Sequence, residues 1–327
     1  MGYVVYGAGA IGGLVGGRLF EAGFDVALIA RGSHLDALQA RGLRVESPTG
    51  SSTLPIPAVG HPGEIDWSVE HVVLMAVKSH QTAQALVELA TVAPVETPIA
   101  CLQNGIANEP AALRMFPNVQ GVCVMCPASH LDPGVIQAWS TPIAGLLDIG
   151  RYPGGSDHVS DSVAADLSCA TFSSHAVEDI RRWKHRKLLT NLGNVVEAIC
   201  GRDERTGPIA AMLMAEGVAA LAAAGLDVAT EEEDRARRAG TLQLGEIEGR
   251  TRSGGSSWQS LVRHTGAMET DYLNGEIVAL GRMYNVPTPA NAVVQRLARE
   301  AASDRRPPGT IPAATILGLV ERSHQAV

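Results

Sequence analysis

Three glycines near the start of the chain constrain its fold more than any other feature. Residues 7–12 read Gly-Ala-Gly-Ala-Ile-Gly, directly after a strand-like apolar segment at 3–6 and at the start of a helical pattern at 11–21. In that context the glycines permit a tight turn, a close approach of backbone to pyrophosphate, and close packing of helix on strand. The helix N-terminus adds N–H groups and a positive dipole. Rather than a turn without a ligand, we therefore predict a dinucleotide-binding turn formed by Gly7, Ala8, Gly9, Ala10, Ile11 and Gly12.

The first half of the chain predicts a doubly wound, mostly parallel α/β sheet. Short apolar runs bounded by turn residues alternate with helical patterns, and these runs lie at 3–6, 25–30, 72–77, 98–103 and 119–126. Two further strand-like segments, 134–139 and 145–149, are separated only by short turns that contain Pro and Gly. We expect both of them to form an antiparallel extension of the same sheet.

Beyond about residue 173 the pattern changes to helical periodicity rich in Ala, Leu, Glu and Arg. The predicted helices span 179–199, 208–224, 231–250, 267–284 and 290–302. Thr230 and Glu233 have the spacing of a capping box, so the charged run 231–238 is interpreted as a solvated helix start. We therefore expect two domains, an α/β dinucleotide-binding domain at 1–172 and an all-helical domain at 173–327.

Composition excludes several classes of function. The 327 residues carry a formal net charge of −8, so no basic field is available for nucleic acid. No apolar window is long enough to span a membrane, and the chain opens on a strand rather than a basic signal region, so we expect a cytoplasmic protein. The five cysteines favour a reducing compartment. Cys123 and Cys126 form a C-x-x-C, but it lies in an apolar run without a second ligand pair, and we expect buried thiols and no metal site.

The second strand suggests which nucleotide the turn would bind. A carboxylate usually stands near the end of that strand when the ligand is NAD, where it binds the ribose 2′-hydroxyl. Here the strand ends in Leu-Ile-Ala-Arg31, and a guanidinium can instead pair with a 2′-phosphate. Lys78 follows the strand at 72–77, at the sheet edge where ligands bind. NADP(H) is therefore the predicted cofactor, with ordinary surface cations as the alternative reading of both residues.

A polar stripe on the first predicted helix of the second half carries a candidate proton donor. At about 100° per residue, Lys187, Asn191 and Asn194 fall on one helix face. A lysine whose pKa is lowered by burial can donate a proton to a developing alkoxide, and amides can orient a carboxylate or hydroxyl. The alternative is a solvated polar face. Lys184 lies on nearly the same face, so spacing alone leaves it as a rival to Lys187.

These motifs occur in an order that resembles the ketopantoate reductase (2-dehydropantoate 2-reductase) family. The resemblance covers the whole chain and rests on the glycine turn and on 77–82, 102–105, 187–191, Ser256-Ser257, 269–275 and 286–291. It implies NADPH-dependent reduction of a 2-oxo acid to a 2-hydroxy acid, most simply 2-dehydropantoate to pantoate. It also implies an N-terminal Rossmann domain, a C-terminal helical domain, and a possible homodimer.

The resemblance also implies roles for individual residues. Lys187 would be the proton donor, and Glu269 the second catalytic residue, holding the substrate hydroxyl and the cofactor. Asn104 would lie between nicotinamide and substrate, and Ala128 would contact the nicotinamide amide through its backbone. The substrate contacts would be Asn104, Asn191, Asn194 and Ser257. Without the resemblance, Asn104 would be read as a turn residue, Ser257 as an N-cap and Glu269 as a solvated acid.

The chain departs from the family pattern at positions that concern the substrate. Val195 stands where the family usually has its second asparagine, with Asn194 one place early. Trp258 follows Ser257 where Met is usual, and the tryptophan that usually stands two residues before the lysine is displaced to Trp183. These changes leave open a different 2-oxo acid, a ketone or an imine as substrate. A non-catalytic NADP(H)-binding sensor is the alternative of another class.

Overall fold

The computed structural model describes residues 2–202, 204–252, 254–264 and 266–325. The chain divides into two compact units, of which the first comprises Met1–Lys184 and Thr230–Arg252 and the second comprises His185–Ala229 and Ser253–Val327. The sequence suggested one division, between 172 and 173. The structure differs because the helix that follows this point starts within the first unit, and because residues 230–252 return to that unit.

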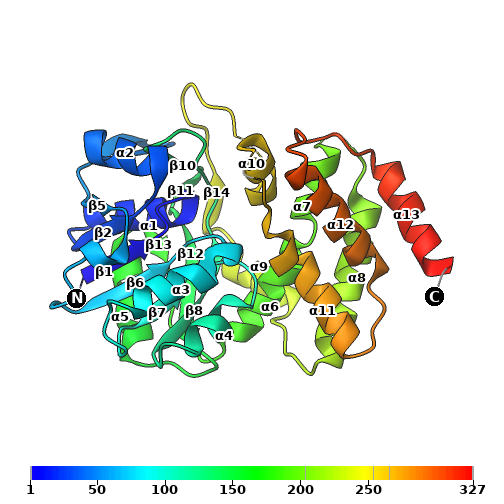
Figure 1. The fold of residues 1–327 in the computed structure, drawn as a ribbon, viewed down its shortest axis with the longest axis horizontal. Coiled ribbons are helices and arrows are strands. Elements are labelled where there is room, and N and C mark those ends of the chain that lie inside the picture. The colour runs from blue at the N-terminus through cyan, green and yellow to red at the C-terminus, as the bar shows by residue number, and fades with distance from the viewer. Residues whose placement is uncertain (1, 203, 253, 265, 326–327) are drawn as a thin grey trace. The chain divides into compact units, whose positions relative to one another are not determined.

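An eight-stranded sheet forms the centre of the first unit (Figure 1), in the order β13-β12-β8-β7-β6-β1-β2-β5. Neighbouring strands are parallel except β12, which runs antiparallel to β8. The doubly wound, mostly parallel sheet is thus confirmed, and its antiparallel extension is formed by the segment predicted at 145–149. The strands are β1 (Gly2–Tyr6), β2 (Val26–Ile29), β5 (Ala58–Val59), β6 (His71–Met75), β7 (Ile99–Cys101), β8 (Val119–Met125), β12 (Gly145–Arg151) and β13 (Phe172–Ser173).

The other segment predicted to extend the sheet, 134–139, does not join it. Its strand β10 (Val135–Ala138) lies in a separate four-stranded sheet, between β3 (Leu43–Ser47) and β9 (Ala128–Ser129), with β4 (Gly50–Leu54) at the far edge. Buried Ile136 of this strand packs against Gly13 of helix α1 (Ala10–Glu21). The apolar residues that suggested a sheet strand therefore cover the helix instead.

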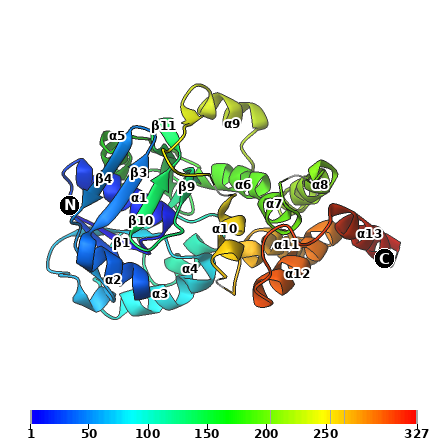
Figure 2. The ribbon, with the colours of Figure 1, turned by 90° about the horizontal axis from the view of Figure 1, so that it is seen from above.

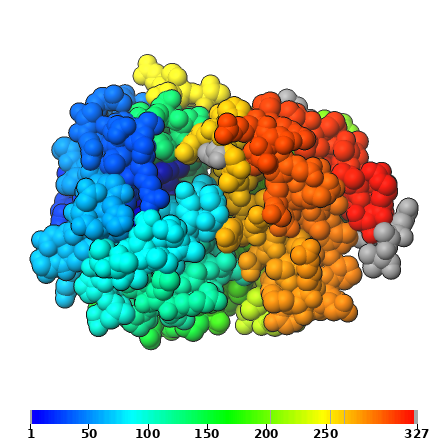
Figure 3. All heavy atoms as spheres, in the orientation of Figure 1, coloured from blue at the N-terminus to red at the C-terminus, as the bar shows by residue number. Residues whose placement is uncertain are grey.

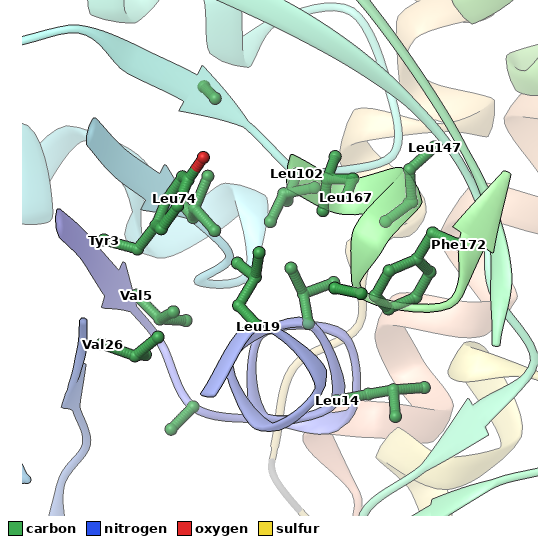
Figure 4. Packing of buried hydrophobic residues seen from close by; sticks show 14 of the residues in the cluster. Tyr3, Val5, Leu14, Leu19, Val26, Leu74, Leu102, Leu147, Leu167 and Phe172 are labelled. Carbon is green, nitrogen blue, oxygen red and sulfur yellow. The ribbon is translucent and has the colours of Figure 1, made fainter. Parts of the chain in front are cut away.

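Helices cover both faces of the large sheet, and the alternation along β1 shows why. Tyr3 and Val5 belong to the core on the side of α1 and α5 (His158–Cys169), whereas Val4 and Tyr6 belong to the core on the side of α3 (Thr82–Ala90) and α4 (Asn108–Leu113). On the first side, Leu14 and Leu19 of α1 point into a cluster with residues from β1, β2, β6 and α5 (Figure 4). Because β1 is buried on both faces, it is apolar throughout.

Residues 230–252 form helix α9 (Glu231–Arg238) and strand β14 (Leu242–Leu244), which pairs with β11 (Ser140–Pro142). The capping box of Thr230 and Glu233 is present as predicted, but the helix predicted to reach residue 250 ends at Arg238. Part of the charged run is not solvated, because Asp234 is buried and the Arg237 guanidinium forms two hydrogen bonds of 2.7 Å to Asp148 of β12. This bidentate pair fixes the returning segment to the large sheet.

The regular elements described in the second unit are helical, as the sequence predicted. They are the end of α6 (Ile180–Asn191), α7 (Asn194–Cys200), α8 (Gly207–Ala223), α10 (Ser256–Val262), a short 3-10 helix at Glu269–Tyr272, α11 (Asn274–Met283), α12 (Pro289–Ser303) and α13 (Ala313–Gln325). The helix predicted at 179–199 is broken between Asn191 and Asn194, and the one predicted at 267–284 is regular only from Asn274. No helix among the described residues is long and apolar enough to cross a membrane.

A buried amide network holds the break between α6 and α7. Asn274 Nδ2 donates to the carbonyl of Leu192 at 3.2 Å and to Asn291 Oδ1 at 3.0 Å. The Asn291 amide donates in turn to Glu216, whose carboxylate also accepts the backbone N–H groups at the start of α12. Because Asn274 and Asn291 are completely buried, their amides need these partners to offset the loss of water. The network fixes the course of the chain at Leu192.

A buried ion pair anchors the start of α6 in the first unit. The Lys184 ammonium lies 2.5 Å from Glu109 Oε1, and the two side chains are 5% and 2% exposed. The ammonium also donates to the carbonyl of Gln103 at 2.8 Å and to that of Val122 at 3.3 Å. Of the three N–H donors of the ammonium, two thus have carbonyl acceptors, and the charge is paired with Glu109. Lys184 therefore joins α6, α4 and the chain after β7.

Breaking this ion pair should destabilise the protein strongly. Replacing Lys184 by Met keeps the volume but leaves the Glu109 carboxylate buried without its partner. We expect the Lys184→Met variant to lose about 3–5 kcal/mol of unfolding free energy in urea titrations. The double variant with Glu109→Leu should recover part of the loss, since it removes the uncompensated charge.

The matched control is Arg235→Gln, which breaks an ion pair with Glu231 whose side chains are both 76% exposed. Such a pair contributes about 0–1 kcal/mol. Equal stability of the Lys184→Met and Arg235→Gln variants would show that the buried pair does not hold the fold.

Candidate functional site

The predicted dinucleotide-binding turn lies where the winding of the sheet changes direction. β1 has β2 on one side and β6 on the other, so the segments after β1 and β6 meet at the carboxyl edge of the sheet. Gly7 follows β1 with φ +106°, and a Cβ atom there would be 2.7 Å from the backbone nitrogen of Val77. The turn is therefore packed directly against the chain after β6. In open α/β sheets, this switch point is where ligands bind.

The three glycines have distinct surroundings. A Cβ atom on Gly12 would come within 2.2 Å of the Gly7 carbonyl oxygen and 2.9 Å of Ala76 Cβ, whereas a Cβ atom on Gly9 would meet nothing within 4 Å. Gly9 is also the N-cap of α1, and no side chain caps that helix end. Open space at a helix N-terminus without a capping side chain fits a phosphate group. Gly7 and Gly12 thus serve packing, and Gly9 leaves room for a ligand.

His34 supports this turn and was not predicted from the sequence. It lies in α2 (Gly32–Arg41), and its Nδ1 accepts the backbone N–H of Gly134 at 2.9 Å. Its Nε2 lies 2.7 Å from the carbonyl oxygen of Ala8. Since Nδ1 is an acceptor, Nε2 carries the proton and donates it to Ala8. The imidazole therefore links the glycine turn to the chain before β10, a contact between residues far apart in sequence.

Arg31 stands at the end of β2 as predicted, but it has a partner that sequence reasoning missed. Its Nη2 lies 2.5 Å from Glu88 Oε2 of α3. The strand end 28–31 contains no carboxylate, and the structure supplies one from a helix 57 residues further along the chain. The end of β2 thus carries an ion pair and not an isolated cation.

The remaining predicted cofactor residues also lie in the first unit. Half-buried Lys78 precedes a short 3-10 helix at Ser79–Gln81. Half-buried Asn104 lies in the bend after β7, and its carbonyl accepts a 3.1 Å hydrogen bond from Asn108. Ala128 lies in β9 and pairs with Ala138 of β10, so it is part of the small sheet.

Buried hydrogen bonds connect the segments that carry Lys78 and Asn104. Gln103 Nε2 donates to the carbonyl of Val77 and to Thr82 Oγ1, both at 2.7 Å. Thr82 donates to Asn108 Oδ1 at 2.8 Å, and Asn108 Nδ2 donates to Ser79 Oγ at 3.2 Å. The two predicted ligand segments are therefore held together by side chains that point inward between them.

The second unit brings together the predicted amides. Asn191 ends α6, Asn194 begins α7, and Asn194 Nδ2 donates to Asn191 Oδ1 at 3.2 Å. Val195, which stands where the family usually has asparagine, is 1% exposed and lies in the core. Half-buried Lys187 lies one helical turn before Asn191 on α6. The ammonium of the rival Lys184 is buried in the first unit, where it pairs with Glu109 and donates to two carbonyls, so Lys187 stays the candidate proton donor.

Ser257 and Glu269 lie on short helices of the same unit. Buried Ser257 is the second residue of α10, and Gly255 is the N-cap, so Ser257 does not cap this helix. Trp258 packs on Gly254, and the Arg202 guanidinium lies 5.9 Å from the centroid of its ring. A cation over an indole face is a favourable contact that fixes the ring. Half-buried Glu269 begins the 3-10 helix at Glu269–Tyr272.

The described residues contain no group of His, Cys, Asp and Glu side chains arranged to hold a metal ion. Cys123 is buried in β8, and Cys126 follows that strand with its Sγ 3.4 Å from the carbonyl oxygen of Ala144. Neither thiol lies at the glycine turn.

The structure places the predicted site residues in both units. The predicted nucleotide residues Gly7–Gly12, Arg31, Lys78, Asn104 and Ala128 lie in the first unit, and Lys187, Asn191, Asn194, Ser257 and Glu269 lie in the second.

Known proteins share both parts of this arrangement. The 2-dehydropantoate 2-reductase of Pyrococcus horikoshii is 28% identical over 309 residues, which are 91% of this chain and 97% of that protein. A PanE/ApbA family ketopantoate reductase from Ralstonia eutropha JMP134 has a similar crystal structure, with a TM-score of 0.77 and 27% identity, over 94% of this chain and 100% of that one. The ternary structure of D-mandelate dehydrogenase with NADH and anilino(oxo)acetate shares the fold, with a TM-score of 0.79 and 21% identity, over 93% of this chain and 99% of that one.

Family models match both halves of the sequence. The model of ketopantoate reductase PanE/ApbA matches residues 3–154, and the model of its C-terminal part matches residues 179–302. Because the two matches together span well over half of the residues, the chain belongs to the ketopantoate reductase PanE/ApbA family of oxidoreductases, which act on CH–OH groups.

Proposed function

We propose that this protein reduces a 2-oxo acid to a 2-hydroxy acid with NADPH, and that 2-dehydropantoate is the first substrate to test. The observation that carries the proposal is the open space at Gly9, at a helix end without a capping side chain and at the switch point of the sheet. Family membership supports the reaction class, because the curated relative is a 2-dehydropantoate 2-reductase.

Residues of the first unit would hold the cofactor. The backbone of Gly7–Gly12 would receive the pyrophosphate, with Arg31 and Lys78 supplying positive charge for the remaining phosphate. Asn104 and the backbone of Ala128 would orient the nicotinamide ring, which when bound supplies the hydride. The buried hydrogen bonds behind Lys78 and Asn104 support this role, since a rigid frame reduces the ordering that binding requires.

Residues of the second unit would handle the substrate. Lys187 would neutralise the charge that develops on the carbonyl oxygen and donate the proton that completes the hydroxyl group. Asn191, Asn194 and Ser257 would orient the carboxylate or hydroxyl groups of the substrate without adding charge. Glu269 would accept a hydrogen bond from a substrate hydroxyl. The hydrogen bond between Asn194 and Asn191 supports a shared role for the two amides.

A different 2-oxo acid is the second candidate substrate. Val195 is buried and offers no amide, and the bulky indole of Trp258 adjoins Ser257 and is held by Arg202. A solved protein of the same fold is a D-mandelate dehydrogenase that binds anilino(oxo)acetate. An aromatic 2-oxo acid belongs in the first substrate panel for that reason, beside 2-dehydropantoate and short aliphatic 2-oxo acids.

Two glycine substitutions should separate nucleotide binding from packing. In Gly9→Ala the new methyl group meets only open space, so we expect the unfolding free energy to change by less than about 0.5 kcal/mol. NADPH should nevertheless bind at least about tenfold more weakly, because the methyl group fills the approach of the pyrophosphate. Gly12→Ala places its Cβ against the Gly7 carbonyl and should lose about 1–3 kcal/mol of stability.

Urea titration gives the stability of each variant, and fluorescence titration of NADPH gives its affinity. Wild-type NADPH affinity in Gly9→Ala would contradict the placement of the phosphates at this turn. Unchanged stability in Gly12→Ala would instead contradict the packing role of that residue.

Replacing Lys187 by Met should remove the proton donor. We expect kcat to fall by about 10²–10⁴-fold with the best 2-oxo acid, the usual contribution of a positioned general acid. The dissociation constant of NADPH should stay close to that of the wild type, because the proposed cofactor contacts lie elsewhere. Oxidation of NADPH, followed by its absorbance across the substrate panel, measures both the activity and its specificity.

The matched control is Arg181→Met, which removes an exposed cation from the same helix. Full activity of Lys187→Met would end its assignment as proton donor. Failure of the wild type to oxidise NADPH with every acid of the panel, while it still binds the nucleotide, would favour the non-catalytic sensor.

A further inference from the structure

The end of β2 carries two opposite charges, and together they bear on the choice of nucleotide. We propose that Glu88 is a cofactor-selectivity residue, whose carboxylate opposes the binding of a 2′-phosphate at Arg31 and can accept the 2′-hydroxyl of NADH. The proposal rests on the proposed binding of a nicotinamide dinucleotide at the glycine turn. It predicts a smaller preference for NADPH than an isolated Arg31 would give.

Glu88 is the fixed member of the pair. Its Oε2 accepts hydrogen bonds from the Tyr6 hydroxyl and from Arg31, and its Oε1 accepts one from Gln84 at 3.1 Å. Its side chain is 17% exposed, whereas that of Arg31 is 58% exposed. Tyr6 is buried at the end of β1, immediately before the glycine turn. The Glu88 carboxylate is thus held in place by the residue that precedes the glycine turn, while the side chain of Arg31 is mostly exposed.

The carboxylate is ionised at neutral pH. The hydrogen bond from Tyr6 lowers the pKa of Glu88 below its usual value; burial opposes this shift, and the hydrogen bond from Gln84 and the charges of Arg31 and His61 add to it. The segments of α2 and α3, coloured blue and cyan, belong to the surface of the first unit in the view of Figure 3. Because the negative charge of Glu88 offsets the positive charge of Arg31, a ligand at the end of β2 would not meet a full positive charge.

A 2′-phosphate and a 2′-hydroxyl would meet this pair differently. The phosphate carries about −1.5 to −2 charges at pH 7, so it must compete with Glu88 for the guanidinium and remain close to a fixed like charge. The hydroxyl of NADH carries no charge and can donate a hydrogen bond to the carboxylate, as acids at this edge of the sheet do in NAD sites. Removing the carboxylate should thus favour NADPH and weaken NADH.

The test is the ratio of dissociation constants, NADH over NADPH, measured by nucleotide fluorescence without any 2-oxo acid. Glu88→Gln keeps the shape of the side chain and an acceptor for Tyr6 but removes the charge. We expect the ratio to rise by about tenfold, the effect of one charge-assisted hydrogen bond. Glu88→Ala, which leaves neither charge nor acceptor, should raise the ratio as well. The rise should shrink at high salt, because the pair is partly exposed.

The matched control is Glu231→Gln, which removes the same charge from the exposed pair with Arg235. Its helix α9 lies on the opposite side of the first unit from α3 (Figure 2), so the ratio should stay within about twofold of the wild type, as expected beyond a Debye length. A ratio that is unchanged or lower in folded Glu88→Gln and Glu88→Ala overturns the proposal.

This outcome is distinct from failure of the proposed function. The ratio is measured without turnover, so a protein that binds both nucleotides but reduces no 2-oxo acid refutes the proposed reaction and still decides the role of Glu88. A wild-type protein that binds neither nucleotide overturns both proposals.

Discussion

The buried ammonium of Lys184 is the interaction on which the arrangement of the first unit depends. It neutralises Glu109 and ties the start of α6 to three segments that lie 62–81 residues earlier in the sequence, namely the start of α4, the chain after β7 and β8. A charge removed from water in this way is tolerated only when acceptors surround it. The carbonyl of Gln103 is one of those acceptors, and Asn104 is the next residue. The position of a predicted nicotinamide ligand therefore depends on electrostatics inside the protein.

Much of the fold follows from patterns that are local in sequence. The mostly parallel sheet, the glycine turn, the capping box at Thr230 and the helical second half could all be predicted, because apolar periodicity and glycine geometry act over a few residues. The predictions of secondary structure were wrong where residues far apart in the sequence contact each other. Residues 134–139 cover α1 and do not extend the large sheet. The helix that begins at Glu231 ends at Arg238, the residue after the ion pair of Arg237 with Asp148.

In the candidate site too, patterns that are local in sequence could be recognised, whereas contacts between separate elements could not. Spacing suggested Gly9, Arg31 and the stripe of Lys187, Asn191 and Asn194 as candidates, since each set is local in sequence, although the stripe spans the break between α6 and α7. Spacing could not identify Glu88 as the partner of Arg31, nor His34 as the support of Ala8, because these contacts join separate elements. Spacing also left Lys184 and Lys187 equivalent. The buried ion pair with Glu109 and the two carbonyl acceptors mark Lys184 as a structural cation and leave Lys187 as the candidate acid.

Asn274 and Asn291 lie within sequence motifs that accompany the proposed catalytic residues, yet both are completely buried in the second unit, where Asn274 donates to the carbonyl of Leu192 and to the side-chain oxygen of Asn291. They hold the break between α6 and α7, where Asn191 ends one helix and Asn194 begins the next. If substitution of Asn274 or Asn291 lowers turnover, the cause would therefore be a distorted break between α6 and α7. Such a result would not be evidence that either residue contacts a ligand. In this chain, a residue can belong to a sequence motif of the site without taking part in its chemistry.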